Sequence, residues 1–485
     1  MGALIAVVGK AHENTFAAAT AMLNALNHRG SDSFGIASSG EIIMKKTLKE
    51  LRSECISSTA LIGHNYVKLL PRDKAQPVQN GSSTFVFEGR LFPALAESEA
   101  CFAARRVSTE SGAIRFIREF DGSYVFAANV HEGIIVGRDV VGACPLYFGE
   151  NEKVCAVASE RKALWRIGIT EAFPFPPGKL AFVDEKGFHL KTAKIIKQPP
   201  TQQVNLQNAG KQLANVLARS TKDRVSDVEE VAVAFSGGVD SCVIASLAKV
   251  CGVETHLIYV ALEEARETDF VKHAADDLGL PLHVAEYTIV EVEESLPIVL
   301  WLIEEPNPVN ASIAIPLFWV AEQAAALGLH VLMTGQGGDE LFGGYARYLG
   351  DYEAHGLAGL QERLYKDVVS SHAVNFQRDD KVCTFHKVEL RMPFNGLKVI
   401  ELALSFPVRL KVASPRDELR KRVLRQTAKY LAIPEFVSEK PKKAIQYTTG
   451  VNQALKKLAV KEGLTVRRYV EKVFKKVCCE LKEDG

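Results

Sequence analysis

The sequence predicts a chain of two parts, an α+β domain followed by an α/β domain built on a parallel sheet. Residues 1–190 contain short apolar runs separated by frequent turns, and residues 191–208 are polar. From residue 209 onward, short apolar runs alternate with helical periodicity. Such alternation is typical of βαβ units, whereas mixed strands and turns favour sheets packed against a few helices. We therefore expect domains at 1–190 and 209–485, joined by a linker at 191–208.

The individual elements follow from the same patterns. In the first domain we expect strands at 4–8, 83–87, 123–128 and 133–137 and a helix near 15–26. In the second we expect strands at 231–235, 256–260 and 330–333, a largely helical part after about Tyr345, and one lysine-rich amphipathic helix at 453–483. Ligands of open parallel sheets bind at the carboxyl ends of the strands, so the loops after these strands are candidate sites.

Composition limits the class of function. The chain has 485 residues, with 59 basic and 58 acidic side chains and a net charge of +1. This balance argues against a general nucleic-acid or membrane-surface binder. The nine cysteines lack metal-ligand spacing, the apolar runs are too short to span a bilayer, and no basic signal segment precedes them. We expect a cytoplasmic protein that acts on small molecules; a homodimer is compatible with the sequence, which does not set the oligomeric state.

The segment Ser236–Ser241 is the most informative part of the chain. It reads Ser-Gly-Gly-Val-Asp-Ser and lies between an apolar strand pattern and an apolar helix pattern. Gly237 and Gly238 allow a tight turn, and free backbone N–H groups at the helix start suit a phosphate. Asp240 would repel that phosphate unless a cation such as Mg²⁺ bridged them. The alternative is a plain glycine turn with a serine cap.

A second glycine-rich loop follows the strand expected at 330–333. Residues 334–345 contain five glycines and the carboxylates Asp339 and Glu340. Two lone carboxylates, Asp240 and Asp339, at two strand ends could share a Mg²⁺–pyrophosphate group. The alternative is a glycine turn with an acid that caps the next helix.

The Ser236–Ser241 segment resembles the pyrophosphate-loop signature of ATP pyrophosphatases, and nearly the whole chain is similar to the asparagine synthetase B family. The resemblance implies an N-terminal Ntn-hydrolase-like αββα sandwich, a type 2 glutamine amidotransferase domain. It also implies a C-terminal adenine-nucleotide α-hydrolase-like domain. It further implies ATP and Mg²⁺ as cofactors, and Asp240 and Asp339 as metal ligands. The ATP site it implies comprises Ala234, Ser236, Gly237, Gly238, Asp240, Ser241, Val260, Thr334 and Gly335.

Further family segments lie outside these two loops. Lys442, in the run Glu439–Gln446, matches a family lysine that reaches the α-phosphate, where a cation would stabilise developing negative charge. The alternative for Lys442 is a solvated lysine in a basic run. The segments 378–381 and 389–394 also resemble family segments that shape the floor of the active site, and we expect their role to be mainly structural.

The first domain keeps family segments such as His28–Asp32 but departs from the family at the glutaminase chemistry. The family nucleophile is a cysteine at position 2, where this chain has Gly2. The expected glutamine-gripping arginine falls near Tyr66, and the oxyanion-hole asparagine is replaced by Glu88, whose charge would repel an oxyanion. We therefore expect no glutaminase nucleophile and no glutamine hydrolysis.

The second domain also departs from the asparagine synthetases. Gln336 stands where they carry a glutamate that acts as a base or orients the amine, and an amide cannot take that proton. Near 309–312 their aspartate-gripping arginine is missing. The related β-lactam synthetases have also lost the glutaminase cysteine, but they keep a Tyr/Glu pair for which we find no match.

These departures leave three readings of the function. The resemblance implies an ATP-dependent, AMP-forming amide synthetase, with Lys442 and Gln336 in catalysis and ammonia or an amine as nitrogen donor. Aspartate is its expected acid, which would give asparagine. The alternatives are the same chemistry on another acid, as in a β-lactam synthetase, and a non-catalytic nucleotide-binding regulator.

Overall fold

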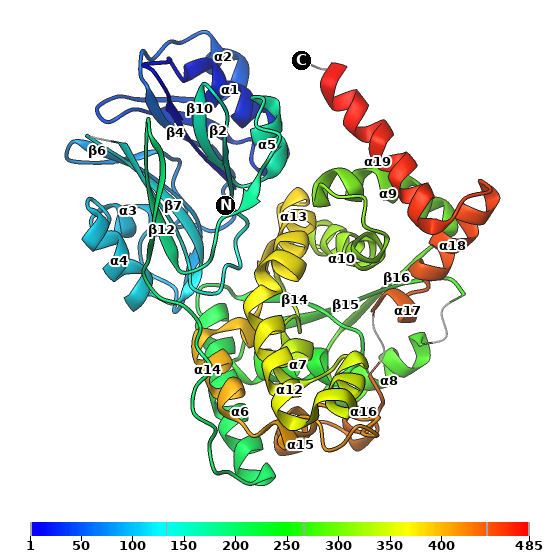
Figure 1. Cartoon of the computed structure of the whole chain (residues 1–485). Coiled ribbons are helices and arrows are strands. Elements are labelled where there is room, and N and C mark those ends of the chain that lie inside the picture. The colour runs from blue at the N-terminus through cyan, green and yellow to red at the C-terminus, as the bar shows by residue number, and fades with distance from the viewer. Residues whose placement is uncertain (1, 132, 265–266, 443–444, 484–485) are drawn as a thin grey trace. The chain divides into compact units, whose positions relative to one another are not determined.

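The structure is a computed structural model that describes residues 2–131, 133–264, 267–442 and 445–483 (Figure 1). The chain forms two compact units, residues 1–196 and 197–485. Each unit has its own sheets and core, and each is described by itself.

The first unit contains two antiparallel sheets with helices on their outer faces. One sheet has the strand order β11-β9-β10-β1-β4-β2-β3, and the other β13-β12-β8-β7-β6-β5. Helices α1 and α5 pack on the first sheet, and α3 and α4 pack on the second. Its elements are β1 (Gly2–Gly9), α1 (Phe16–Ala25), β2 (Ser33–Ala37), β3 (Ile42–Lys45), α2 (Leu48–Arg52), β4 (Ala60–Tyr66), β5 (Val78–Asn80), β6 (Ser83–Leu91), α3 (Glu99–Ala104), α4 (Glu110–Glu119), β7 (Gly122–Val130), β8 (Gly133–Arg138), β9 (Tyr147–Glu150), β10 (Val154–Ala158), α5 (Arg161–Arg166), β11 (Phe173–Pro174), β12 (Lys179–Asp184) and β13 (Gly187–Thr192).

Strand β1 shows why the two sheets stack. Its residues are apolar and buried throughout, and successive side chains of a strand point to opposite faces. Ile5 and Val7 pack into the core beneath α1, whereas Leu4 and Ala6 pack into the core between the two sheets. A strand buried on both faces therefore separates two cores, and the predicted αββα sandwich is confirmed.

The second unit is an α/β fold on one parallel sheet of order β16-β15-β14-β17-β18. Helices α6 and α7 form a packed pair with α7 against β14 and β15, and α10 also packs on these strands. The elements are α6 (Leu206–Val225), β14 (Glu230–Ala234), α7 (Val239–Val250), β15 (Glu254–Leu262), α8 (Thr268–Leu278), β16 (Leu282–Tyr287), α9 (Ile289–Ile303), α10 (Pro308–Ala326), β17 (Val331–Met333), α11 (Gly338–Phe342), α12 (Arg347–Ser371), α13 (Gln377–Phe385), β18 (Glu389–Arg391), α14 (Leu397–Ser405), α15 (Arg422–Tyr430), α16 (Glu435–Ser438), α17 (Ile445–Thr448), α18 (Val451–Lys461) and α19 (Val466–Glu483).

The strand order places a binding crevice between β14 and β17. From β14 the chain adds β15 and β16 on one side, and then returns to add β17 and β18 on the other. The crevice at such a reversal, at the carboxyl ends of the strands, is where open α/β sheets bind ligands. Both glycine-rich loops of the sequence start there.

One predicted helix is wrong. The expected continuous helix at 453–483 is two helices, α18 and α19. Gly463 has φ +67°, a left-handed conformation that a glycine adopts readily and that ends α18. The expected linker at 191–208 is also shorter at both ends, because β13 extends to Thr192 and α6 begins at Leu206.

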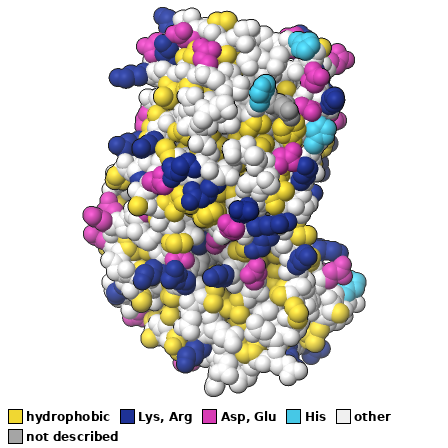
Figure 2. Space-filling view, turned by 90° about the vertical axis from the view of Figure 1, so that its left-hand side faces the viewer, with side chains coloured by type: hydrophobic (Ala, Val, Ile, Leu, Met, Phe, Trp, Pro, Cys, Tyr) yellow, Lys and Arg dark blue, Asp and Glu magenta, His cyan; other side chains and the backbone are white. Residues whose placement is uncertain are grey.

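Among the described residues, no helix is long and apolar enough to cross a bilayer. On the face drawn in Figure 2, basic and acidic side chains are interspersed, as a net charge of +1 would suggest.

Candidate active site

The loop after β14 is folded by its two serines. The Ser236 backbone N–H donates to Ser241 Oγ at 3.2 Å, and Ser241 Oγ donates to the Gly238 carbonyl at 3.1 Å. Gly237 has φ +66° and turns the chain toward α7. Asp240 then lies in the first turn of α7. The tight turn thus presents a serine pair and one carboxylate at the end of β14.

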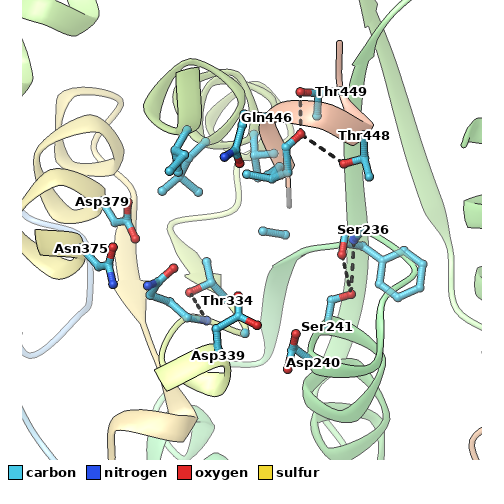
Figure 3. A pocket seen from close by; sticks show the side chains of 18 of the residues that line it. Ser236, Asp240, Ser241, Thr334, Asp339, Asn375, Asp379, Gln446, Thr448 and Thr449 are labelled. Atoms are coloured by element: carbon cyan, nitrogen blue, oxygen red, sulfur yellow. Dashed lines mark hydrogen bonds between the residues drawn. The ribbon is translucent and has the colours of Figure 1, made fainter. Parts of the chain in front are cut away.

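The loop after β17 approaches this turn closely. A Cβ added at Gly335 would lie 2.7 Å from Asp240 Cβ, and one at Gly338 would lie 2.6 Å from Asp240 Oδ1. Real Cβ atoms do not come so near, so a side chain at either position would have to displace Asp240. Because β14 and β17 pair in parallel, their carboxyl ends meet, and Asp240 and Asp339 are brought to one end of a pocket (Figure 3).

Two lysines join the two aspartates. The buried Lys421 ammonium lies 2.5 Å from Asp240 Oδ2 and 2.5 Å from Asp339 Oδ1. Lys442 Nζ lies 2.8 Å from Asp339 Oδ2 and 3.9 Å from Asp240 Oδ2. Burial alone would raise the pKa of Asp339, but the charges of both lysines outweigh it and hold that pKa well below its usual range.

Lys421 is the main functional candidate that the sequence reading missed. It stands in the basic run Arg420-Lys421-Arg422, a pattern typical of a solvated surface. In the structure Arg420 and Lys421 have φ of 50° and 53°, which is uncommon for residues with side chains. This backbone conformation, immediately before α15, turns the Lys421 side chain inward. It could not be predicted from the sequence.

The pocket beyond the carboxylates has an apolar wall. Of the residues predicted to bind ATP, seven line it, namely Ala234, Ser236, Asp240, Ser241, Val260, Thr334 and Gly335. Gly237 and Gly238 form the turn but lie outside the wall. Ile258, Ile313 and Leu317 add apolar surface, and Thr448 and Thr449 of the α17 segment lie at the other end (Figure 3). An apolar slot that ends at two carboxylates and two ammonium groups suits a nucleotide with its phosphates.

The residues predicted to act in catalysis also line the pocket. Lys442 contacts both aspartates, and Gln336 lines the pocket from the same loop as Asp339. Arg378 and Asp379, from a segment expected to shape the floor of the site, line it as well. Arg378 Nη2 lies 2.8 Å from Asp379 Oδ1.

The pocket also contains a tyrosine–glutamate contact that the sequence did not indicate. The Tyr345 hydroxyl donates to Glu340 Oε1 at 2.5 Å, and Asn375 Nδ2 donates to the same oxygen at 2.7 Å. Glu340 is buried, and this burial raises the pKa of its carboxyl group. The pair comes from the glycine-rich loop itself, and both residues line the pocket.

The donor set fits a magnesium ion. Asp240 and Asp339 offer carboxylate oxygens, the hard ligands that Mg²⁺ prefers. Because both contact the same ammonium nitrogen, the two carboxylates lie within reach of a single ion. Asp240 and Asp339 would hold the ion.

In the first unit, the residues at the expected glutaminase positions are buried and closely packed. A Cβ at Gly2 would lie 1.7 Å from the Asn65 carbonyl oxygen. Glu88 Oε2 lies 3.2 Å from His64 Nε2, and both side chains are buried. Tyr66 is buried as well. Burial lowers the pKa of His64, so its contact with Glu88 is a hydrogen bond within the core rather than an ion pair. This packing leaves no room for a side chain at Gly2.

Comparison with known proteins gives the family. The glutamine amidotransferase domain model matches residues 67–166, and the asparagine synthase model matches residues 212–357 and 349–476. A putative asparagine synthetase (glutamine-hydrolyzing) of Methanocaldococcus jannaschii is 29% identical over 93% of this chain and 94% of its own length. Asparagine synthetase B of Escherichia coli is 23% identical over 76% of this chain and 71% of its own length.

The chain is also similar to solved structures. A glutamine phosphoribosylpyrophosphate amidotransferase of B. subtilis is 16% identical, with a TM-score of 0.35, over 58% of this chain and 65% of its own. The two asparagine synthase segments, by contrast, span more than half of the chain, so this protein belongs to the asparagine synthase family, a family of ATP-dependent carbon–nitrogen ligases.

Proposed function

We propose that this protein is an AMP-forming amide synthetase that activates a carboxylate with ATP and joins it to ammonia or an amine taken from solution. The observation that carries the proposal is the meeting of Asp240, Asp339, Lys421 and Lys442 at the end of an apolar pocket. Opposite charges so arranged suit a metal-bound triphosphate, and the family membership supports the same chemistry.

The roles of the residues follow from their places. A bound Mg²⁺ would neutralise phosphate charge beside Asp240 and Asp339. The substrate carboxylate attacks the α-phosphorus, the bond to the β-phosphate oxygen breaks, and pyrophosphate leaves. Lys421 and Lys442 stabilise the negative charge that develops. The amine then attacks the acyl carbon, loses a proton, and AMP leaves with the C–O electron pair.

The nitrogen source is the point at which this chain differs from glutamine-hydrolysing relatives. Gly2 offers no nucleophile, and the nearby Asn65 carbonyl leaves no space for one. Glu88 places a carboxylate where an oxyanion would need hydrogen-bond donors. These features support direct use of ammonia or of a substrate amine.

Aspartate is the acid that the relatives' names suggest, and asparagine is then the product. A second candidate is a different acid. It is favoured by Asn310, which stands near the expected aspartate-gripping arginine, and by Gln336, which replaces the family's acidic residue. The first activation step is the same for either acid.

The test is acid-dependent exchange of labelled pyrophosphate into ATP in the presence of Mg²⁺. We expect exchange with a suitable acid, and a loss of about a hundred-fold or more in Asp240→Asn, which keeps the shape but removes the charge. Amide formation should then proceed with ammonium and not with glutamine.

Two results would contradict the proposal. Equal rates with glutamine and ammonium would refute the nitrogen source. An absence of exchange across a panel of carboxylates, in a protein that still binds Mg²⁺–ATP, would favour a non-catalytic nucleotide-binding regulator.

A further inference from the structure

A second cavity, of about 800 Å³, adjoins the nucleotide pocket. The two share Glu340, Tyr345, Asn375, Arg378 and Lys442 in their walls. An acid that reacts at the α-phosphate must approach Lys442, and this cavity gives it a place to do so. Its volume falls in the range of roughly 300–1,000 Å³ that encloses a drug-sized ligand, far more than four-carbon aspartate needs.

At the end of the cavity near the nucleotide, Arg378 is already paired with protein groups. Arg378 Nε donates to Asp379 Oδ1 at 2.8 Å, and Nη2 contacts the same oxygen at 2.8 Å. Its Nη1 donates to Asn310 Oδ1 at 3.3 Å, where Asn310 stands near the expected family arginine. All three guanidinium nitrogens of Arg378 thus already contact protein acceptors. Lys442, the other described cation shared by both cavities, contacts Asp339. The second carboxylate of a short dicarboxylate such as aspartate would therefore compete with protein groups for these two cations.

At the far end of the cavity, two arginine side chains contact the same aspartate. Arg347 Nη2 lies 2.8 Å from Asp367 Oδ2, and Arg363 Nε lies 3.2 Å from Asp367 Oδ1. The Arg347 guanidinium is held over the Tyr345 ring, 4.3 Å from its centroid. Each arginine has five N–H donors, so both keep donors for a further anion. The two arginines exceed the one aspartate by a positive charge.

The rest of the lining also suits an anionic molecule with an apolar body. Among the described residues that line it, five are cations and two are anions: Arg347, Arg363, Arg378, Arg420 and Lys442 against Glu340 and Asp367. Three large side chains at the wall, Val309, Val374 and Tyr447, are more than half exposed. Exposed apolar surface beside charged groups is typical of a ligand-binding cavity.

We propose that the acid substrate is longer than aspartate and carries a second anionic group, which Arg347 and Arg363 bind at the far end of the cavity. The reacting carboxylate lies near Lys442, and an apolar chain joins the two groups. This inference rests on the proposed adenylating function and names the class of acid for the same site.

The test uses a series of straight-chain dicarboxylates from succinate to suberate, with hexanoate and octanoate as singly charged counterparts and aspartate as reference. Pyrophosphate exchange is measured for each acid, and binding is measured by calorimetry with a non-hydrolysable ATP analogue. We expect kcat/KM to be at least about ten-fold higher for a longer dicarboxylate than for aspartate or the matched monocarboxylate. Arg347→Gln should raise its KM about ten-fold and leave the KM for ATP unchanged.

Arg219→Gln is the matched control, because Arg219 is an exposed arginine paired with Asp223 on α6, outside the cavity. It should change neither KM. Exchange that is fastest with aspartate, or unaffected by Arg347→Gln, would overturn this inference and leave the proposed function intact. Dicarboxylate binding without exchange would instead overturn the proposed function, and neither binding nor exchange with any acid would overturn both.

Discussion

At the scale of single residues, Lys421 contributes a charge to the active site that could not be predicted from the sequence. Lys442 could be predicted because it stands in a recognisable segment, whereas Lys421 lies in an ordinary basic run. Its inward direction depends on two consecutive left-handed residues, Arg420 and Lys421. Such conformations cost on the order of 1–3 kcal/mol each and persist where surrounding structure enforces them. Here the enforcing contacts are the ion pairs with Asp240 and Asp339.

We predict that Lys421→Met lowers acid-dependent pyrophosphate exchange by about a hundred-fold or more. The substitution removes a buried cation from the place where phosphate charge develops, and a single lost stabilising group of this kind costs about 10²–10³ in rate. Exchange kinetics with saturating acid provide the measurement. Lys429→Met is the control, because Lys429 lies on α15, the helix that begins directly after Lys421, and pairs with surface glutamates. A Lys421→Met enzyme within about two-fold of the wild type would show that Lys442 alone supplies the needed charge.

At the scale of elements, the site depends on two strand-end loops that come unusually close. The sequence predicted both loops, and it predicted that they share one edge of a parallel sheet. It could not predict which of their glycines are required, because that depends on distances between loops a hundred residues apart. Gly335 and Gly338 face Asp240, whereas Gly237 faces Phe270 of α8. Likewise the Tyr345–Glu340 contact is set by the turn that leaves α11 and could not be read from spacing.

We predict that Gly344→Ala lowers exchange at least about ten-fold and lowers the melting temperature. A Cβ there would lie 1.9 Å from Asp339 Oδ1 and 2.3 Å from Lys421 Cε, and both atoms are held by ion pairs. Gly350→Ala is the matched control, since Gly350 lies within α12 and a Cβ there meets nothing within 4 Å. Alanine should stabilise that helix by about 0.5–1 kcal/mol and leave exchange unchanged. Full activity of Gly344→Ala would mean that the loop shifts freely, contrary to the packing described here.

At the scale of the whole molecule, both units have the fold expected from the sequence, but they differ in where their charged residues lie. The fold of each unit could be predicted from its sequence patterns, because apolar strands and the alternation of strands with helices indicate which residues form the cores. The second unit keeps its charged residues gathered at a pocket. In the first unit, Glu160 is buried in ion pairs with Arg29 and Lys162, and Glu88 is hydrogen-bonded to buried His64. These polar groups therefore lie inside the sandwich and not at a pocket. The sequence predicted the loss of glutaminase residues but not that the space itself is filled.

The filled space leads to a prediction about the first unit. Gly2→Cys, made in a form that exposes the cysteine at the amino terminus, should not release glutamate from glutamine. The new Cβ would lie 1.7 Å from the Asn65 carbonyl oxygen, so the strand pairing of β1 with β4 must shift before a thiol fits. Adding Glu88→Asn removes the carboxylate but also leaves His64 buried without its partner, which should lower the melting temperature further. Glutamate release is followed by a coupled assay, and ammonium-dependent amide formation serves as the control that the second unit remains active. Glutamine hydrolysis by the single variant would mean that the first unit still has an open glutaminase pocket and lacks only its nucleophile.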